Sequence, residues 1–174
     1  TALRILMGLV ASGNKPITLL GDDSLSARNN DFMINSLSQA DVTVEKIQTD
    51  NLPVSICGPW FKDNIESKTA TIDCSKSSQA LTSWMIASAL FPCDVTVKLD
   101  GKAVSKKHYL LTKKMCNDSG AKIEINRDNI SLNRWDIQLL PEYIIPGDSS
   151  IVSFAILLVK LHNCKARIFN WPDD

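Results

Sequence analysis

The sequence predicts an α/β (α+β) protein built from repeated units, and three observations support this. Shifting the chain by 78 positions pairs Leu3 with Leu81 and Met7 with Met85, which reveals an internal repeat. Each copy has the pattern of an apolar helix, a strand, a more polar helix and another strand. Segments that contain Gly or Pro separate these elements. Repeats of this length are supersecondary units that bury their helices against one another.

The elements follow in order along each copy. In the first copy a helix, a strand, a helix and a strand are expected at Ala2–Ser12, Ile17–Leu20, Asp31–Gln39 and Val42–Glu45. The second copy repeats them at Gln79–Phe91, Val95–Lys98, His108–Asn117 and Lys122–Ile125. A third, incomplete copy is expected to form a helix at Ile151–Leu161 and a strand at Ala166–Phe169. The first helix of each copy is apolar nearly all round and should be interior, whereas the second has a thinner apolar stripe and should lie outside.

Composition narrows the function classes. The 174 residues, 44% of them hydrophobic, suffice for one core, or for one domain and part of another. The formal net charge of zero provides no global field for nucleic acid or an anionic membrane, so an anion site must be local. The most apolar run, Ile151–Leu161, is shorter than the roughly 20 residues of a membrane span. The opening Thr1-Ala2-Leu3-Arg4, without an initiator Met, leads us to expect a piece of a longer chain.

The cysteines point to a reducing compartment. Five are scattered along the chain, with no Cys-x-x-Cys pair and no His at ligand spacing. An odd count without a disulfide pattern fits the cytoplasm, and no metal site is expected.

Two helix starts are candidate anion sites. Ser77-Ser78-Gln79 precedes the first helix of copy two, and Asp148-Ser149-Ser150 precedes that of copy three. The start of a helix offers free N–H groups and partial positive charge, to which serine hydroxyls add donors. If these helices run parallel, their starts converge on one face. Taken alone, Ser77, Ser78 and Ser149 are better explained as simple helix caps.

Cations lie near these starts. Arg4 sits in an otherwise apolar helix, where an unpartnered charge would be costly. Arg28 precedes the second helix, and Lys106 occupies its repeat position because 28 plus 78 is 106. A structural salt bridge for Arg4 and an exposed loop charge for Arg28 are the alternatives. We find no Ser-His-Asp set and no P-loop, so the pattern favours anion binding over hydrolysis.

Six motifs occur in one order along the chain: Thr1-Ala2-Leu3-Arg4, Gly21-Asp22-Asp23-Ser24-Leu25-Ser26-Ala27-Arg28, Pro53-Val54-Ser55-Ile56-Cys57-Gly58, Ser77-Ser78-Gln79, Ser105-Lys106 and Pro146-Gly147-Asp148-Ser149-Ser150. In order and spacing they resemble the enolpyruvyl transferases of the 5-enolpyruvylshikimate-3-phosphate (EPSP) synthase family. The first resembles the end of the family's Asn-Ala/Ser-Gly-Thr-Ala-x-Arg motif. The second resembles Gly-Asp-x-Ser-Leu-x-x-Arg-Pro, except that Asn29 replaces Pro, which is expected to loosen the loop around Arg28.

The resemblance implies repeated βαβαββ units around buried parallel helices, an inside-out α/β barrel that is incomplete here. Residues 1–146 would be most of a first domain, in two repeats at 1–70 and 71–146, and residues 147–174 the start of a second. The implied reaction moves the enolpyruvyl group of phosphoenolpyruvate to the 5-hydroxyl of shikimate 3-phosphate, giving EPSP and phosphate in the shikimate pathway of aromatic amino acid biosynthesis. It requires no metal or organic cofactor.

The resemblance also implies roles for individual residues. Ser77, Ser78 and Ser105 would bind the phosphate of shikimate 3-phosphate, and Gln79 would reach both substrates. His108, where many members have Tyr, would contact shikimate 3-phosphate. Phosphoenolpyruvate would be bound by Arg28 and Gln79, with Arg4 in the same pocket. No catalytic residue is assigned within this chain, because the family's general acid and base groups come largely from segments that it lacks. The chain alone is therefore expected to be inactive.

Two other functions remain open. The related transferase that acts on UDP-N-acetylglucosamine is expected to carry a reactive Cys before Arg28, and the loop from Gly21 to Ala27 has none. A non-catalytic binding module of the same fold is the second alternative. The apolar helix of the third copy would need a cover, so self-association or docking onto the first domain is expected.

Overall fold

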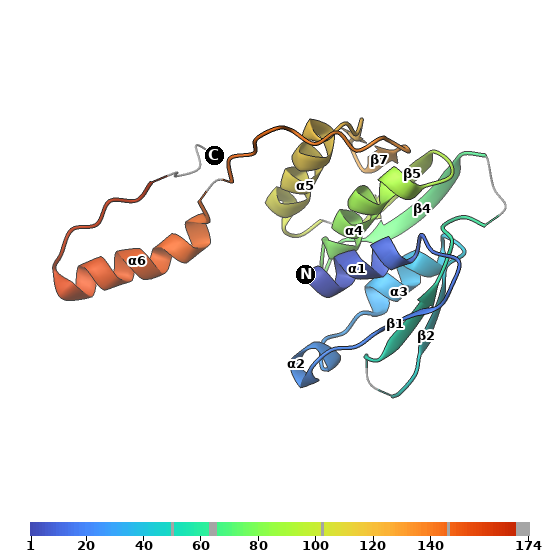
Figure 1. The fold of residues 1–174 in the computed structure, drawn as a ribbon, viewed down its shortest axis with the longest axis horizontal. Helices are drawn as coiled ribbons and strands as arrows, with labels where there is room; N and C mark the ends of the chain where they lie inside the picture. The colour runs from blue at the N-terminus through green and yellow to red at the C-terminus, as the bar shows by residue number, and fades with distance from the viewer. Residues whose placement is uncertain (50, 63–65, 102, 146, 170–174) are drawn as a thin grey trace. The chain divides into compact units, whose positions relative to one another are not determined.

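The computed structural model describes residues 1–49, 51–62, 66–101, 103–145 and 147–169, without the side chains of Ser149 and Ser150. The chain divides into two compact units, Thr1–Leu139 (unit 1) and Leu140–Asp174 (unit 2). All strands found in the described ranges belong to unit 1, whose path is shown in Figure 1. The predicted domain boundary at 146/147 stays a prediction.

The first copy forms the blue and cyan part of unit 1 in Figure 1. Its elements are α1 (Ala2–Val10), β1 (Ile17–Leu19), α2 (Asp23–Ser26), α3 (Asp31–Ser38), β2 (Thr43–Lys46) and β3 (Val54–Cys57). The strands make an antiparallel sheet in the order β1-β3-β2. The four predicted elements are confirmed, and the short helix α2 and the strand β3 are additional.

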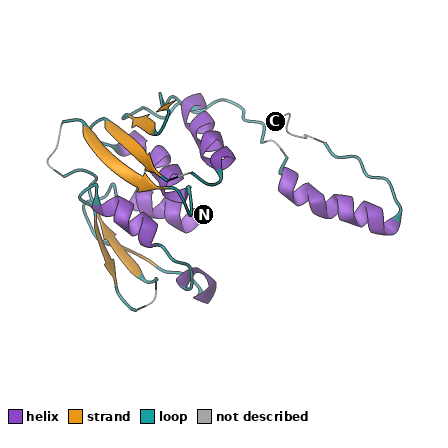
Figure 2. Ribbon diagram, turned by 180° about the vertical axis from the view of Figure 1, so that it is seen from behind, coloured by secondary structure: helices purple, strands orange, loops and turns teal. Residues whose placement is uncertain are grey.

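The second copy has the predicted βαβαββ order. Its elements are β4 (Lys68–Asp73), α4 (Gln79–Ala87) extended by the 3-10 turn η1 (Ser88–Leu90), β5 (Val95–Asp100), α5 (Lys106–Asp118), β6 (Glu124–Asn126) and β7 (Asn129–Leu132). The sheet order is β4-β5-β7-β6, and β4 and β5 run parallel. The two sheets remain separate in Figure 2, so the described residues show a mixed α/β fold without barrel closure.

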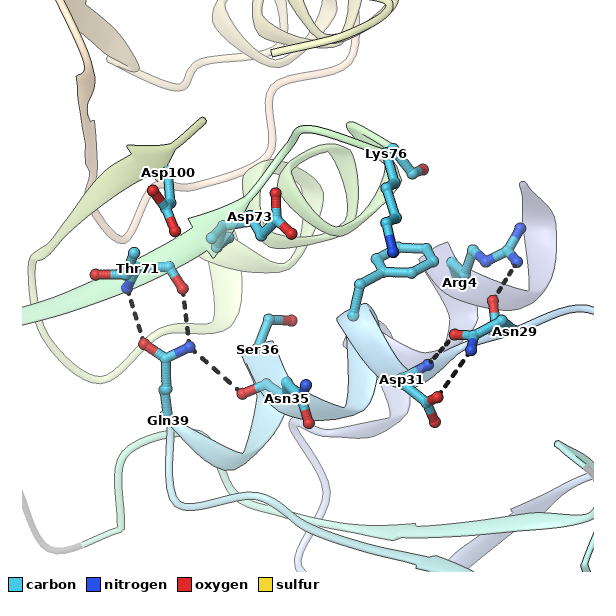
Figure 3. Close-up of a pocket in the computed structure, with 13 residues that line it drawn as sticks. Arg4, Asn29, Asp31, Asn35, Ser36, Gln39, Thr71, Asp73, Lys76 and Asp100 are labelled. Carbon is cyan, nitrogen blue, oxygen red and sulfur yellow. Dashed lines mark hydrogen bonds between the residues drawn. The ribbon is translucent and has the colours of Figure 1, made fainter. Parts of the chain in front are cut away.

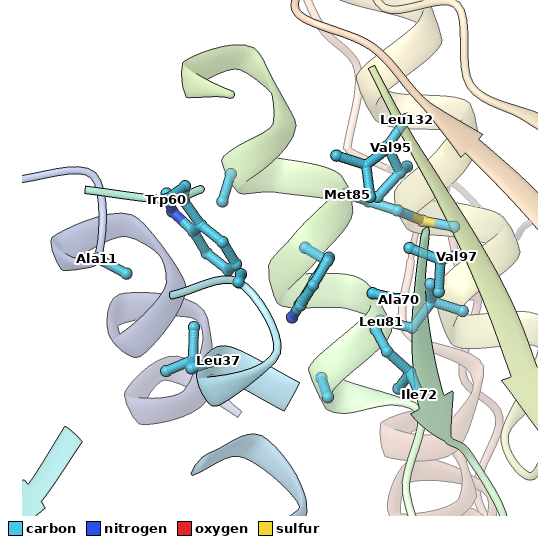
Figure 4. Packing of buried hydrophobic residues seen from close by; sticks show 14 of the residues in the cluster. Ala11, Leu37, Trp60, Ala70, Ile72, Leu81, Met85, Val95, Val97 and Leu132 are labelled. Carbon is cyan, nitrogen blue, oxygen red and sulfur yellow. The ribbon is translucent and has the colours of Figure 1, made fainter. Parts of the chain in front are cut away.

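The core lies where α4 meets its neighbours. One face of α4 packs on the sheet through Leu81 and Met85, which lie against residues of β4 and β5 in Figure 4. The other side carries Trp84, whose ring lies 5.0 Å from that of Trp60 and 5.9 Å from that of Phe91. Both indole N–H groups find acceptors, as buried polar groups require.

The prediction that the first helices are interior is right for α4 and only half right for α1. In α4 seven of the nine residues are buried, whereas α1 buries four of nine and leaves Leu6 46% exposed. The reason is that the neighbours of α1, namely α4, β1 and β3, pack on its other face. The second helices are expected to lie outside. Eight of the thirteen residues of α5 are exposed, as predicted, whereas α3 exposes three of its eight residues and buries Met33, Ser36 and Leu37.

Unit 2 contains α6 (Ser149–His162). The strand predicted at Ala166–Phe169 is wrong, because no regular structure occurs there in the described part of the chain. A strand needs a hydrogen-bonded neighbour, and none is formed there. No helix within the described residues is long and apolar enough to cross a membrane.

Candidate anion-binding site

The site begins where two parallel strands end. Strands β4 and β5 finish side by side, at Asp73 and Asp100, and each continues through a loop into a helix. The loops touch, since the Val104 N–H donates to the Cys74 carbonyl at 3.1 Å. In α/β sheets ligands bind beyond the carboxyl ends of parallel strands, where helix starts point at the ligand. Ser77, Ser78 and Gln79 follow β4, and Ser105 follows β5.

The start of α4 has hydrogen-bonding capacity to spare. Ser78 occupies the capping position and is 3% exposed, yet its side chain makes no capping bond. Instead, the Ser77 hydroxyl accepts the Gln79 backbone N–H at 3.2 Å. Simple capping therefore explains Ser77 but leaves the Ser78 hydroxyl without a hydrogen-bond partner among the described residues.

Arg4 joins the two copies at this point. Helices α1 and α4 start at the same end, and Arg4 donates from Nη1 to Gln79 Oε1 at 2.8 Å. It also donates from Nε to Asn30 Oδ1 at 3.0 Å and from Nη2 to the Asn29 carbonyl at 2.9 Å. Arg4 is 9% exposed and makes no salt bridge with any carboxylate in the described ranges. The structural salt bridge considered for Arg4 is thus absent from these residues.

Arg28 is the second cation. It is exposed, and its side chain has no hydrogen bond or ion pair to the described residues. Burial, and then the positive charge of Arg28, lower the pKa of the Arg4 guanidinium. Asp31, at the start of α3, forms its ion pair with Lys46 at 2.7 Å.

Side-chain hydrogen bonds tie the loop that carries Arg28. Asp22 caps α2 by accepting the Leu25 N–H at 2.8 Å, which explains the Gly-Asp start of that motif. Asn29 donates to Asp31 and accepts the Asp31 backbone N–H, both at 2.8 Å. These bonds show that an asparagine can tie a turn through its own side chain, and the expectation that Asn29 loosens the loop stays a prediction.

Not all predicted residues meet. Ser105 is the cap of α5 in a left-handed backbone conformation (φ 54°), again without a capping bond from its side chain. His108 is exposed on the first turn of α5. No hydrogen bond joins either of them to Ser77, Ser78 or Gln79 in the described structure. The convergence of the α6 start with that of α4 stays a prediction, and α6 belongs to unit 2.

Figure 3 shows an open cleft of about 750 Å³ beside this cluster. Its lining comes from α3 and the loop before it, the end of β4 and the loop before α4, and it includes Arg4 and Ser77. The Gln39 side chain closes one side by exchanging two 2.8 Å hydrogen bonds with the Thr71 backbone.

The sequence does not predict the contacts of two residues in the site. The Thr1 hydroxyl accepts from Gln79 Nε2 at 3.3 Å, and the repeat contained the signal, because 1 plus 78 is 79. Asn30 is fully buried beside Arg4 although it stands at the polar start of α3, and no pattern in the sequence indicates that burial.

Comparisons with known proteins agree with these features. The model of the family EPSP synthase (3-phosphoshikimate 1-carboxyvinyltransferase) matches residues 1–174. The 3-phosphoshikimate 1-carboxyvinyltransferase of Colwellia psychrerythraea is 29% identical over 88% of this chain and 36% of its own length. That of Vibrio atlanticus is 31% identical over 85% of this chain and 33% of its own.

Solved structures show the same fold. The EPSP synthase from Acinetobacter baumannii superposes with a TM-score of 0.67 at 21% identity, over 91% of this chain and 34% of that one. The chain thus spans about a third of the length of the curated relatives it matches. With the family model matched from the first residue to the last, this chain belongs to the EPSP synthase family.

Proposed function

We propose that the chain forms one wall of an active site that transfers the enolpyruvyl group of phosphoenolpyruvate to the 5-hydroxyl of shikimate 3-phosphate. The products would be EPSP and phosphate, in the shikimate pathway. In this proposal residues 1–146 are most of the first domain and residues 147–174 begin the second. Other parts of a longer protein would complete the site.

One observation carries the proposal. Arg4 is 9% exposed and binds Gln79 at the start of α4, burial and then the positive charge of Arg28 lower the Arg4 pKa, and neither arginine makes a salt bridge with a carboxylate of the described residues. A desolvated cation is costly without a counter-ion, and the arginine fork suits phosphate and carboxylate oxygens. Both proposed substrates carry phosphate and carboxylate groups, so they supply the missing negative charge.

The roles of the individual side chains follow from their positions. Ser77, Ser78 and Ser105 would donate to the phosphate of shikimate 3-phosphate, with His108 beside it. Arg28 would bind phosphoenolpyruvate, Gln79 would reach both substrates, and Arg4 would support the same pocket. Fixed donors at a helix start stabilise an anion without reorganising.

The reaction proceeds by addition and elimination. The 5-hydroxyl oxygen loses its proton and adds to the central carbon of phosphoenolpyruvate while the methylene carbon gains a proton. The tetrahedral intermediate then loses phosphate and a proton and regenerates the double bond. We expect the groups that move these protons to lie elsewhere, so the isolated chain should release no phosphate from the two substrates. Turnover close to that of a full-length relative would contradict this expectation.

Isothermal titration of the chain with shikimate 3-phosphate tests the proposal. Ser78→Ala removes one hydrogen bond to a charged group, which is worth about 1.5–3 kcal/mol, so the affinity should fall about tenfold or more. Ser67→Ala is the matched control, because Ser67 is exposed and lies before β4, at the opposite end of the strand from the site. Its affinity should equal that of the wild type.

The outcomes separate the candidate functions. Saturable binding that Ser78→Ala weakens and Ser67→Ala spares supports the transferase site. An absence of saturable heat in the wild-type chain contradicts the proposal and favours the non-catalytic module.

A further inference from the structure

We propose that Arg4 and Asn30 form a buried clamp that positions Arg28 and Gln79 for the anionic substrate. The inference rests on the proposed function. It makes Arg4 a positioning residue and adds Asn30, which belongs to none of the six motifs, to the determinants of the site.

The first observation is the direction of the Arg4 donors. Its three nitrogen atoms each donate to a different acceptor: Nε to Asn30, Nη1 to Gln79 and Nη2 to the Asn29 carbonyl. The guanidinium also lies 5.3 Å from the centre of the Phe32 ring. Three of its five N–H donors are therefore bound to protein in a fixed fork. Such a guanidinium group holds its neighbours in place, and its positive charge attracts an anionic ligand without contacting it directly.

The second observation is the unusual use of Asn30. At the cap of a helix, Asn normally accepts a backbone N–H of the first turn, but the Asn30 side chain makes no such bond. Its oxygen accepts from Arg4, and its buried Nδ2 has no hydrogen-bond partner. Leaving a buried N–H donor without an acceptor costs about 1–3 kcal/mol. Asn30 thus makes neither a capping hydrogen bond nor a hydrogen bond from Nδ2, and its side-chain oxygen binds Arg4.

The Arg28 loop is anchored on both sides, and the clamp supplies the anchor that follows Arg28. Before Arg28, the Ser26 carbonyl accepts from Asn51 Nδ2 at 3.1 Å. After it, Asn29 and Asn30 are bound by Arg4. Between these anchors the Arg28 side chain has no hydrogen bond or ion pair to the described residues and remains available to a ligand.

The clamp also orients Gln79. Arginine only donates, so the oxygen of the Gln79 amide must face Arg4, and its nitrogen donates to the Thr1 hydroxyl. This leaves the second N–H of that nitrogen for an anion. With the amide turned around, an oxygen would face the negative ligand and repel it.

Two variants test the clamp, with the side-chain amide resonances of Gln79 and the affinity for phosphoenolpyruvate as readouts. Arg4→Lys keeps the charge but cannot reach three acceptors. Asn30→Leu removes the acceptor of Arg4 Nε, which lowers stability, and also removes the unpaired Nδ2, which raises it. Because the two effects oppose each other, the fold should persist. We expect the Gln79 resonances to shift in both variants, and the affinity to fall about tenfold in Arg4→Lys and about fivefold in Asn30→Leu. The double variant should be no weaker than Arg4→Lys alone, because both changes break one unit.

Arg28→Gln is the control for direct contact, since it should weaken binding without moving the Gln79 resonances. Unchanged Gln79 resonances in both clamp variants overturn the clamp, as does an Arg4→Lys variant that binds like the wild type. If the wild-type chain binds no phosphoenolpyruvate, the proposed function fails, but the Gln79 resonances still decide whether the clamp exists.

Discussion

The two copies within unit 1 have their first helices in the same register but differ in how deeply equivalent residues are buried. Repeat positions meet in space, since Thr1 and Gln79 are 78 apart and hydrogen-bonded. However, Trp84 on α4 is fully buried, while its repeat partner Leu6 on α1 is 46% exposed, where 6 plus 78 is 84. The repeat therefore predicts the path of the chain and the register of the helices. Burial depends on which elements pack around each copy, and that differs.

The candidate chemistry lies where the copies diverge. Arg4 stands at the repeat position of Thr82, and buried Asn30 at that of exposed His108, since 4 plus 78 is 82 and 30 plus 78 is 108. Copy one thus contributes guanidinium groups, and copy two contributes hydroxyls and an amide at the start of α4. The proposed pocket needs both contributions, because anion binding requires charge as well as directed donors.

The largest expected effect compares Trp84→Ala with Leu6→Ala. Trp84 fills the core and donates to the Ser36 hydroxyl at 3.1 Å, so its removal should lower the free energy of unfolding by about 3–5 kcal/mol. Leu6→Ala at the exposed repeat position should cost about 0.5 kcal/mol or less. Urea unfolding followed by far-ultraviolet circular dichroism measures both, independently of tryptophan fluorescence.

Equal losses of unfolding free energy in Trp84→Ala and Leu6→Ala would contradict the difference in burial between the two copies. They would mean that the exposed face of α1 is covered in solution, a different face from the third-copy helix for which the sequence led us to expect self-association. Sedimentation at two protein concentrations would then show whether a second copy of the chain covers Leu6.

A smaller effect concerns Cys116, whose repeat partner is Ser38, since 38 plus 78 is 116. Burial raises the pKa of the Cys116 thiol to about 11. Because the unfolded thiol titrates near pH 8.5, its contribution to stability is fully present below that pH and is lost as the pH rises towards 11. The expected loss is about 2–3 kcal/mol by pH 11.

Unfolding midpoints between pH 7.5 and 10.5 test this for the wild type and Cys116→Ala. The variant should be less stable at pH 7.5 but should lose less with rising pH. Titrating Lys and Tyr side chains affect both proteins alike and cancel in the difference. Parallel curves would show that the thiol is exposed to solvent more than its 6% exposed fraction implies.

Sequence reasoning found most of the helices because their apolar periodicity is strong. It missed β4, whose inward residues include the small Ala70, so the alternation is weak. It placed a strand at Ala166–Phe169 because a short apolar run carries no information about its pairing partner. The motif residues at the start of α4 were found as anion-binding candidates, but the partners of Arg4 come from positions 26 and 75 residues away, which only the fold brings together.

The smallest effect separates the two cations at the starts of the second helices, Arg28 and its repeat partner Lys106. If copy one supplies the charge, Arg28→Gln should weaken phosphoenolpyruvate binding about tenfold, or about 1.4 kcal/mol, and Lys106→Gln less than twofold. Burial and then the positive charge of Arg28 lower the pKa of Arg4, and the causes of that shift do not include Lys106. Titration with phosphoenolpyruvate at two salt concentrations measures both variants, because screening should weaken the Arg28 contribution first. Equal losses would assign the charge to both copies, and the asymmetry between them would then concern burial alone.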